Sequence, residues 1–99
     1  MVKLNLGCGY DIKEGYINVD FYHHDGVDFV QDLNVKEWGI KENSVDYILC
    51  KNVLEHLKEP ELFWDNVKRI LKVGGIVEVI VPHKDADGAY STFGHRGFM

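Results

Sequence analysis

The sequence predicts a single α/β domain built on an open, mainly parallel sheet. Residues 45–81 form a strand, helix, strand pattern, and such a unit implies parallel strands joined by a right-handed crossover. Within residues 75–81, apolar side chains occur at both odd and even positions, which is typical of a strand covered on both faces. The 99 residues suffice for one hydrophobic core and are too few for a second domain.

Five strands and one long helix are predicted along the chain. The strands, marked by apolar alternation or by β-branched and aromatic residues, are expected over residues 2–6, 16–20, 27–30, 45–50 and 75–81. The helix is expected over residues 60–72, because Pro60 suits a first helical position and apolar residues from Phe63 onward recur on one face. Gly74 is placed to end this helix with a left-handed cap.

The connections on either side of the second predicted strand are short. Nine residues precede this strand and six follow it, whereas a helical crossover takes at least about ten to twelve. Six extended residues reach about 20 Å, which is enough to return the chain along a four-residue strand of about 13 Å. A parallel arrangement of the second and third strands is therefore expected, with a hairpin as the competing interpretation.

Charge and hydropathy narrow the classes of partner. Eleven Lys and Arg against sixteen Asp and Glu give a net charge of −5, which disfavours phosphate neutralisation and hence nucleic-acid binding. The longest apolar stretch, residues 76–81, is too short to cross a bilayer, and the N-terminus lacks a secretory signal. We expect a cytoplasmic chain with no nucleic-acid or membrane partner, in which Cys8 and Cys50 are reduced thiols.

A glycine turn after the first strand is the main candidate for a binding site. Gly7 and Gly9 follow directly on this strand, at the edge where open α/β sheets bind ligands, and glycine lets backbone N–H groups approach a ligand. Asp20 is expected at the carboxyl end of the next strand, where its two oxygens match the two hydroxyls of a ribose. The spacing of eleven residues from Gly9 to Asp20 and the lack of a third glycine disfavour a dinucleotide fingerprint, and the Gly-Lys-Ser/Thr of a P-loop is missing.

The ordered motifs of the chain resemble those of the class I S-adenosylmethionine-dependent methyltransferases, particularly the methyltransferase-11-like group. Besides Asp32-Leu33, the resemblance rests on LNLGCG (4–9), GYINVD (15–20), NSVDYI (43–48), VLEHL (53–57) and RILKVGG (69–75). It implies a Rossmann-like sheet of order 3-2-1-4-5 that lacks the C-terminal antiparallel strands of a complete member. It also implies S-adenosylmethionine as cofactor, S-adenosylhomocysteine as product, and methyl transfer to a small-molecule acceptor.

The resemblance implies roles for individual residues. The implied cofactor-binding residues are Gly7, Cys8, Gly9, Asp20, Asp32, Leu33 and Asn52. The glycine turn would hold the amino-acid end of the cofactor and Asp20 the ribose. Asp32 and Leu33 would lie by the adenine, and Asn52 near the methionyl part. His56 is the candidate catalytic residue, as a general base, because histidine is the residue type most often used for proton transfer at neutral pH.

Several of these side chains also have structural interpretations. Asp32 suits a cap for the turn over residues 34–38, and Glu55 with His56 suits a helical turn held in place. The adjacent residues His23, His24 and Asp25 resemble a metal cluster in composition. Neighbouring histidines in a loop seldom face one ion, so no metal site is predicted. Glu78, inside a predicted strand, is expected to be paired or near an edge, because a lone buried carboxylate is costly.

The last residues of the sequence leave several interpretations of the fold and function open. Residues 1–82 are predicted to form the cofactor-binding core and residues 83–99 an irregular, glycine-containing tail. The fifth strand would then be an exposed apolar edge, which invites pairing with another chain. Three interpretations remain: a fragment of a longer protein, a homodimer through this edge, or a tail that covers the edge. The alternative functions are a catalytically incomplete module that binds a nucleoside or a protein, and an NAD-linked or nucleotide-sugar enzyme of related fold.

Overall fold

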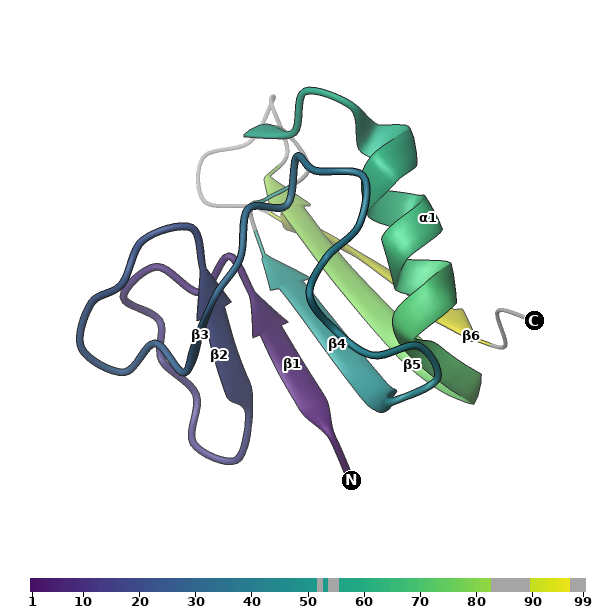
Figure 1. The fold of residues 1–99 in the computed structure, drawn as a ribbon, viewed down its shortest axis with the longest axis horizontal. Coiled ribbons are helices and arrows are strands. Elements are labelled where there is room, and N and C mark those ends of the chain that lie inside the picture. The colour runs from purple at the N-terminus through teal and green to yellow at the C-terminus, as the bar shows by residue number, and fades with distance from the viewer. Residues whose placement is uncertain (52, 54–55, 83–89, 97–99) are drawn as a thin grey trace.

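The computed structural model describes residues 1–51, 53, 56–82 and 90–96. Its elements in chain order are β1 (Lys3–Leu6), β2 (Ile17–Asp20), β3 (Phe29–Val30), β4 (Val45–Lys51), α1 (Pro60–Ile70), β5 (Leu71–Pro82) and β6 (Tyr90–Arg96). The strands form one sheet in the order β3-β2-β1-β4-β5-β6 (Figure 1). Each neighbouring pair from β3 to β5 is parallel, which confirms the predicted α/β class and the Rossmann-like order 3-2-1-4-5.

The chain returns from β2 to β3 without a helix. Val19 lies opposite Phe29 in a parallel register, so the hairpin interpretation is wrong. Gly26 turns the chain shortly before β3 with a φ of +92°, a left-handed conformation that favours glycine. β3 is only two residues long, shorter than predicted, and it forms one edge of the sheet.

The helix begins at Pro60 as predicted but ends at Ile70, two residues early, because the chain enters β5 directly. Leu71 pairs with Val45, and the register then shifts so that Ile76 lies opposite Tyr47. The residues between the two pairs depart from regular pairing. Gly74 has a φ of +82° within this irregular stretch and does not cap the helix.

The tail is not irregular throughout. Residues Tyr90–Arg96 form β6, which pairs antiparallel with β5 from Ile76 opposite Arg96 to Pro82 opposite Tyr90. The prediction of an irregular tail is therefore wrong over this segment, and the sheet has one antiparallel strand. The physical reason is the unpaired N–H and C=O groups on the outer edge of β5, a template for any strand within reach. Among the three interpretations of this edge, coverage by the tail is the one the described residues show.

One face of the sheet is covered by α1 and by the loop between β3 and β4 (Figure 1). Phe63, Val67 and Ile70 are fully buried and carry α1 into the main hydrophobic cluster. Trp38 of the loop packs edge-on against Phe63, with the ring centroids 5.7 Å apart. The loop and the helix therefore share one core over this face.

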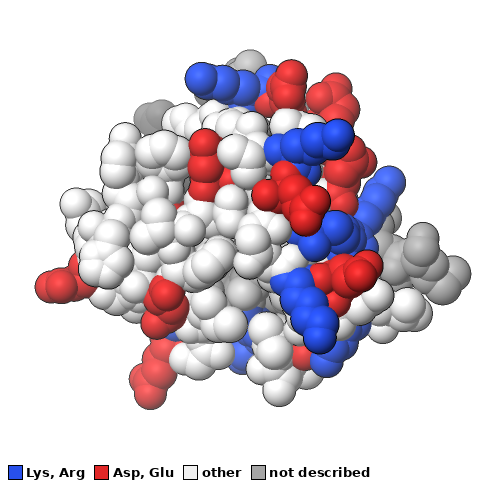
Figure 2. Space-filling view, viewed as in Figure 1, with Lys and Arg blue, Asp and Glu red and all other residues white. Residues whose placement is uncertain are grey.

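The surface on this side is unevenly charged. Figure 2 shows Lys and Arg side chains intermingled with Asp and Glu over α1, beside a largely uncharged area. The basic side chains in this view do not form a continuous patch. Within the part of the chain that the structure describes, no helix is long and apolar enough to cross a membrane.

Two carboxylates on the strands are paired. The Tyr47 hydroxyl donates a hydrogen bond to Glu78 Oε1, which confirms that Glu78 has a partner. Burial raises the pKa of Tyr47, and Glu78 raises it further, so the phenol remains the donor. Asp46 accepts a hydrogen bond from the Val2 N–H at 2.8 Å and lies 3.5 Å from Lys72 Nζ. These contacts lower the pKa of Asp46 and tie the start of β1 to β4.

Asn66 joins α1 to the loop between β3 and β4. It is buried, its Oδ1 accepts a hydrogen bond from the Trp38 N–H at 3.0 Å, and its Nδ2 donates to the carbonyls of Leu62 at 2.9 Å and Lys36 at 3.2 Å. Asn66→Ala removes these bonds and leaves the buried Trp38 N–H without this acceptor. We expect the free energy of unfolding to fall by about 1 to 3 kcal/mol, measured by urea denaturation. The control is Asp65→Ala at the exposed neighbouring position, and equal midpoints for the two variants would contradict this role of Asn66.

Candidate functional site

The glycine turn closes the carboxyl end of β1. Gly7 and Gly9 have φ angles of +64° and +53°, in the left-handed region that favours glycine. A Cβ atom at Gly7 would also collide with the Val53 side chain, whereas one at Gly9 would meet nothing within 4 Å. The Cys8 N–H donates to the Val19 carbonyl at 2.9 Å, which fastens the turn to β2. The turn therefore needs glycine at Gly7 for both conformation and space.

A buried pair of asparagines supports the turn from beneath. Asn5 of β1 donates from Nδ2 to Asn18 Oδ1 of β2 at 2.9 Å and to the Asp11 carbonyl at 2.8 Å. Asn18 Oδ1 also accepts a hydrogen bond from the Lys13 N–H at 2.9 Å. Both asparagines are almost fully buried. This network was not predicted, although two asparagines at interior strand positions indicate buried amides that need partners.

Asp20 lies at the end of β2. Its Oδ1 accepts a hydrogen bond from the Phe21 N–H at 2.9 Å, and its Oδ2 lies 2.8 Å from His24 Nε2. The Asp20 side chain retains 20% exposure. The carboxylate is therefore held by its neighbours at the carboxyl edge of the sheet while it remains accessible to a ligand.

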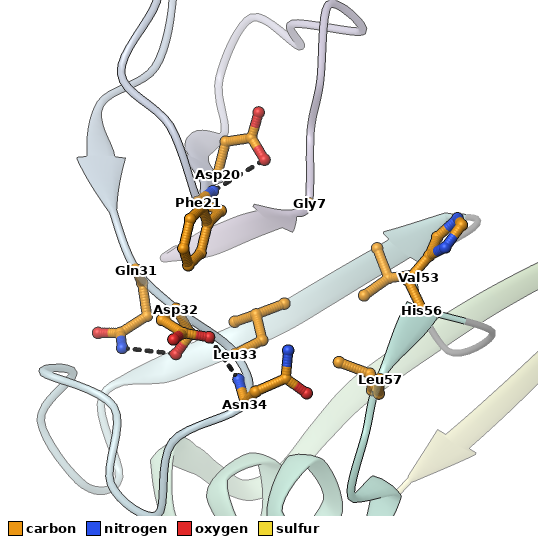
Figure 3. Close-up of a pocket in the computed structure, with 10 residues that line it drawn as sticks. All are labelled: Gly7, Asp20, Phe21, Gln31, Asp32, Leu33, Asn34, Val53, His56 and Leu57. Atoms are coloured by element: carbon orange, nitrogen blue, oxygen red, sulfur yellow. Dashed lines mark hydrogen bonds between the residues drawn. The ribbon is translucent and has the colours of Figure 1, made fainter.

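Asp32 and Leu33 follow β3 and form one wall of a cavity (Figure 3). Asp32 Oδ1 accepts a hydrogen bond from the Asn34 N–H at 2.8 Å, which confirms the structural interpretation of Asp32 as a cap for this turn. Leu33 is buried in the main cluster, and its carbonyl accepts a hydrogen bond from Trp38 Nε1 at 3.3 Å. The core thus fixes this wall through Trp38.

The opposite wall comes from the segment after β4. Val53, His56 and Leu57 lie across the cavity from Asp20 in Figure 3. The His56 side chain is exposed, and the backbone N–H of His56 donates to the Val53 carbonyl at 2.9 Å in a tight turn. The Lys58 N–H donates to Asn34 Oδ1 at 2.8 Å and links the two walls. The predicted site residue Asn52 lies outside the described residues, as does Glu55, which precedes His56.

The structure brings most of the predicted site residues to this cavity of about 260 Å³. The predicted residues that line it are Gly7, Asp20, Asp32, Leu33 and His56. Cys8 lies in a smaller neighbouring cavity that shares Gly7, and Gly9 follows in the same turn. The lining residues that sequence reasoning missed are Phe21, Gln31, Asn34, Val53 and Leu57. Each is the immediate chain neighbour of a predicted site residue, and that proximity was the available signal.

The electrostatics of the cavity favour a ligand that carries hydroxyls, amines or positive charge. Two carboxylates, Asp20 and Asp32, line it, and none of its described lining residues is Lys or Arg. Phosphate groups in protein sites are usually met by such basic side chains. Beside the cavity, burial raises the pKa of the Cys8 thiol, and the negative charge of Asp20 raises it further. Both effects favour the neutral thiol form of Cys8.

The open parallel sheet, the glycine turn after β1 and the acidic residue that ends β2 define a Rossmann-like α/β domain. The methyltransferase domain family matches residues 4–79 of the chain. The chain belongs to this methyltransferase family, as its ordered motifs predicted. A comparison with curated proteins gives no match.

Solved structures of methyltransferases share the fold. A protein from Sulfolobus solfataricus assigned as a type 11 methyltransferase has a TM-score of 0.65 and 26% identity, over 89% of this chain and 60% of that one. An S-adenosylmethionine-dependent methyltransferase from Mesorhizobium loti has a TM-score of 0.65 and 16% identity, over 92% and 55%. A protein assigned as a methyltransferase, in complex with the Haloferax volcanii Trm112 methyltransferase activator, has a TM-score of 0.61 and 22% identity, over 81% and 44%. The chain thus spans between 44% and 60% of these three proteins.

Proposed function

We propose that the chain binds S-adenosylmethionine in the cavity at the carboxyl edge of β1, β2 and β3, and that the protein transfers its methyl group to a small-molecule acceptor. The observation that carries the proposal is the placement of Asp20 and Gly7 around one cavity, in a chain that belongs to the methyltransferase family. S-adenosylhomocysteine, the product, would occupy the same cavity.

The residues present fit such a cofactor. Asp20 offers carboxylate oxygens to the ribose hydroxyls, and it would exchange its contact with His24 for them. The backbone around Gly7, where no side chain fits, lets the amino-acid end approach the turn. Leu33 and Phe21 supply apolar surface for the adenine, and Asp32 an acceptor for its amine. Cys8, Gly9 and Asn52 complete the proposed binding residues.

The chemistry needs little from the protein beyond placement. S-adenosylmethionine supplies a methyl group already activated on a sulfonium cation. With the cofactor bound, the lining residues would contribute mainly by placing it beside the acceptor, and positioning of this kind is a large source of rate acceleration. His56, exposed on the wall opposite Asp20, is the proposed general base for an acceptor that is protonated at neutral pH. In the competing role, its turn shapes the wall without taking a proton.

A ligand panel tests the proposal. We expect S-adenosylmethionine and S-adenosylhomocysteine to raise the melting temperature of the chain, because both bind the folded state only. NAD and UDP-sugars serve as the comparison ligands for the two competing enzyme classes. Stabilisation by NAD or a UDP-sugar alone would overturn the proposal, and no stabilisation by any ligand would favour an incomplete module that binds a protein.

Asp20→Ala measures the part played by the carboxylate. We expect the affinity for S-adenosylhomocysteine to fall by about 1 to 3 kcal/mol, because hydrogen bonds to a charged acceptor are lost. Isothermal titration calorimetry gives the dissociation constants. The matched control is Asp25→Ala, which removes an exposed carboxylate five positions away, in the loop that follows β2. Equal affinities of the Asp20 variant and the parent would remove Asp20 from the site.

A further inference from the structure

Three potential metal ligands meet beside the cofactor cavity. The ligand atoms of Cys8, Asp20 and His24 all lie within 4.8 Å of one another, and His24 Nε2 is 2.8 Å from Asp20 Oδ2. They come from the glycine turn, the end of β2 and the loop before β3. The adjacent residues His23, His24 and Asp25 resemble a metal cluster in composition, but no metal site was predicted from them. The structure instead groups His24 with Asp20, four positions before it, and with Cys8, sixteen positions before it.

We propose that Cys8, Asp20 and His24 form a binding site for a thiophilic divalent cation, with Zn²⁺ as the ion their chemistry favours. Thiolate, imidazole and carboxylate are the three ligand types that zinc sites in proteins use. Hard cations such as Mg²⁺ and Ca²⁺ prefer oxygen ligands alone. Three protein ligands leave one tetrahedral position for water or for a group of a bound molecule.

Neighbouring residues position His24 near the other two side chains before any ion binds. The Val27 N–H donates to the His24 carbonyl at 3.0 Å, and the Tyr10 ring lies against the His24 ring with centroids 5.0 Å apart. Cys8 is buried, and Asp20 and His24 keep side-chain exposures of 20% and 21%. The site is therefore sheltered yet reachable from solvent, as an exchangeable metal site requires.

The distances need only small adjustments. Tetrahedral zinc with ordinary bond lengths separates its ligand atoms by about 3.4 to 3.6 Å. The hydrogen-bonded pair Asp20 and His24 would open from 2.8 Å, and the widest of the three separations, at most 4.8 Å, would close by about 1 Å. Rotation of the Asp20 and His24 side chains supplies movements of this size without a change in the strands.

The local charge favours a cation. The negative charges of Asp20, Asp28 and Asp11 act on Cys8, where they add to the effect of burial in raising the pKa of its thiol. The same charges stabilise a cation at this point. On metal binding, the thiol proton passes to solvent and the thiolate bonds to the ion.

Metal binding and cofactor binding would exclude each other, and this consequence rests on the proposed function. Asp20 is the carboxylate proposed to hold the ribose, and its Oδ2 is the atom nearest His24. An ion held by Asp20 would occupy the position of the ribose hydroxyls. We therefore expect zinc to act as a competitive inhibitor of cofactor binding rather than as a catalytic metal.

Titration of the metal-free chain with Zn²⁺ against a chromogenic chelator tests the site itself, without cofactor. We expect binding of one ion per chain, weakened at least about ten-fold by His24→Gln, because a ligand is lost. The matched control His23→Gln, at the exposed adjacent histidine, should bind as the parent does. Co²⁺ should give a thiolate-to-metal absorption band in the parent that is absent in Cys8→Ser. Equal zinc affinity of the parent and His24→Gln, or an unchanged cobalt spectrum in Cys8→Ser, would overturn the proposal.

A second titration separates the two proposals. With EDTA present, S-adenosylhomocysteine should bind the parent. One equivalent of Zn²⁺ should raise its apparent dissociation constant at least about ten-fold in the parent and in His23→Gln, but not in His24→Gln. Absence of binding in EDTA would overturn the cofactor proposal and leave the zinc site standing. Unchanged S-adenosylhomocysteine affinity in the zinc-loaded parent would overturn the mutual exclusion.

Discussion

Gly7→Ala is expected to lower the free energy of unfolding by about 2 to 5 kcal/mol. The left-handed conformation at φ +64° costs a residue with a Cβ atom roughly 1 to 2 kcal/mol. The new methyl group would also collide with the Val53 side chain, and overpacking of this kind costs roughly 1 to 3 kcal/mol. Chemical denaturation of the variant and the parent measures the loss.

Gly9→Ala provides the matched control for this experiment. Gly9 shares the left-handed conformation, with a φ of +53°, but an added Cβ atom would meet nothing within 4 Å. The control should therefore lose only the conformational part, about 1 to 2 kcal/mol. If both variants lose the same stability, the contact between Gly7 and Val53 is not what restricts this position.

The Gly7 variant also allows the effect on ligand binding to be measured separately from the effect on stability. Gly7 and Val53 both line the cavity, so a displaced Val53 would narrow the space proposed for the cofactor. We expect the Gly7 variant to lose affinity for S-adenosylhomocysteine even under conditions where circular dichroism shows it folded. A folded Gly7→Ala chain that binds the ligand as tightly as the parent would show that the turn is not in contact with it.

The parts of the fold that depend on local patterns could be predicted from the sequence. Alternation over residues 2–6, a helical apolar face from Phe63 onward and an apolar run before Pro82 placed β1, α1 and β5. Parallel pairing of β2 with β3 followed from chain length, because a six-residue coil can span so short a strand. In each of these cases the signal lies within the segment or in the connection next to it.

The parts that depend on distant partners could not be predicted. Residues Tyr90–Arg96 contain glycine and no clear periodicity, and they form a strand because β5 offers an unpaired edge. The grouping of Cys8 with His24 has the same origin, since the sheet brings together a turn and a loop sixteen positions apart. Secondary structure at such places is set by tertiary pairing rather than by propensity.

The candidate site also has parts that could be predicted from the sequence and parts that could not. Asp20 and Gly7 were predictable because the carboxyl ends of adjacent parallel strands meet at one edge, whatever the loops do. The hydrogen bond between Asp20 and His24 was not, because it depends on how the loop before β3 folds back. The ends of the strands therefore predict where the candidate site lies. The conformation of the loops decides which further side chains contact its residues.

Trp38→Ala is expected to cost about 3 to 5 kcal/mol of unfolding free energy. The indole is 1% exposed and packs against Phe63. Its Nε1–H donates to the Leu33 carbonyl at 3.3 Å. Small domains have a total stability of only about 5 to 15 kcal/mol, so thermal or urea denaturation should show a large shift.

Trp38→Phe separates the two contributions of this side chain. Phenylalanine keeps an aromatic ring against Phe63 but has no N–H for the Leu33 carbonyl, so we expect a smaller loss of about 1 to 3 kcal/mol. Leu33 lines the cavity proposed for the cofactor, and the loss of its anchor should weaken S-adenosylhomocysteine binding in both variants, more strongly in the alanine one. Unchanged affinity in a destabilised variant would mean that Asn66 and Arg69, which bond to the Trp38 N–H and carbonyl, hold the wall without the indole. The position of the cavity wall would then be set by the backbone contacts of α1, and the tryptophan would serve the core alone.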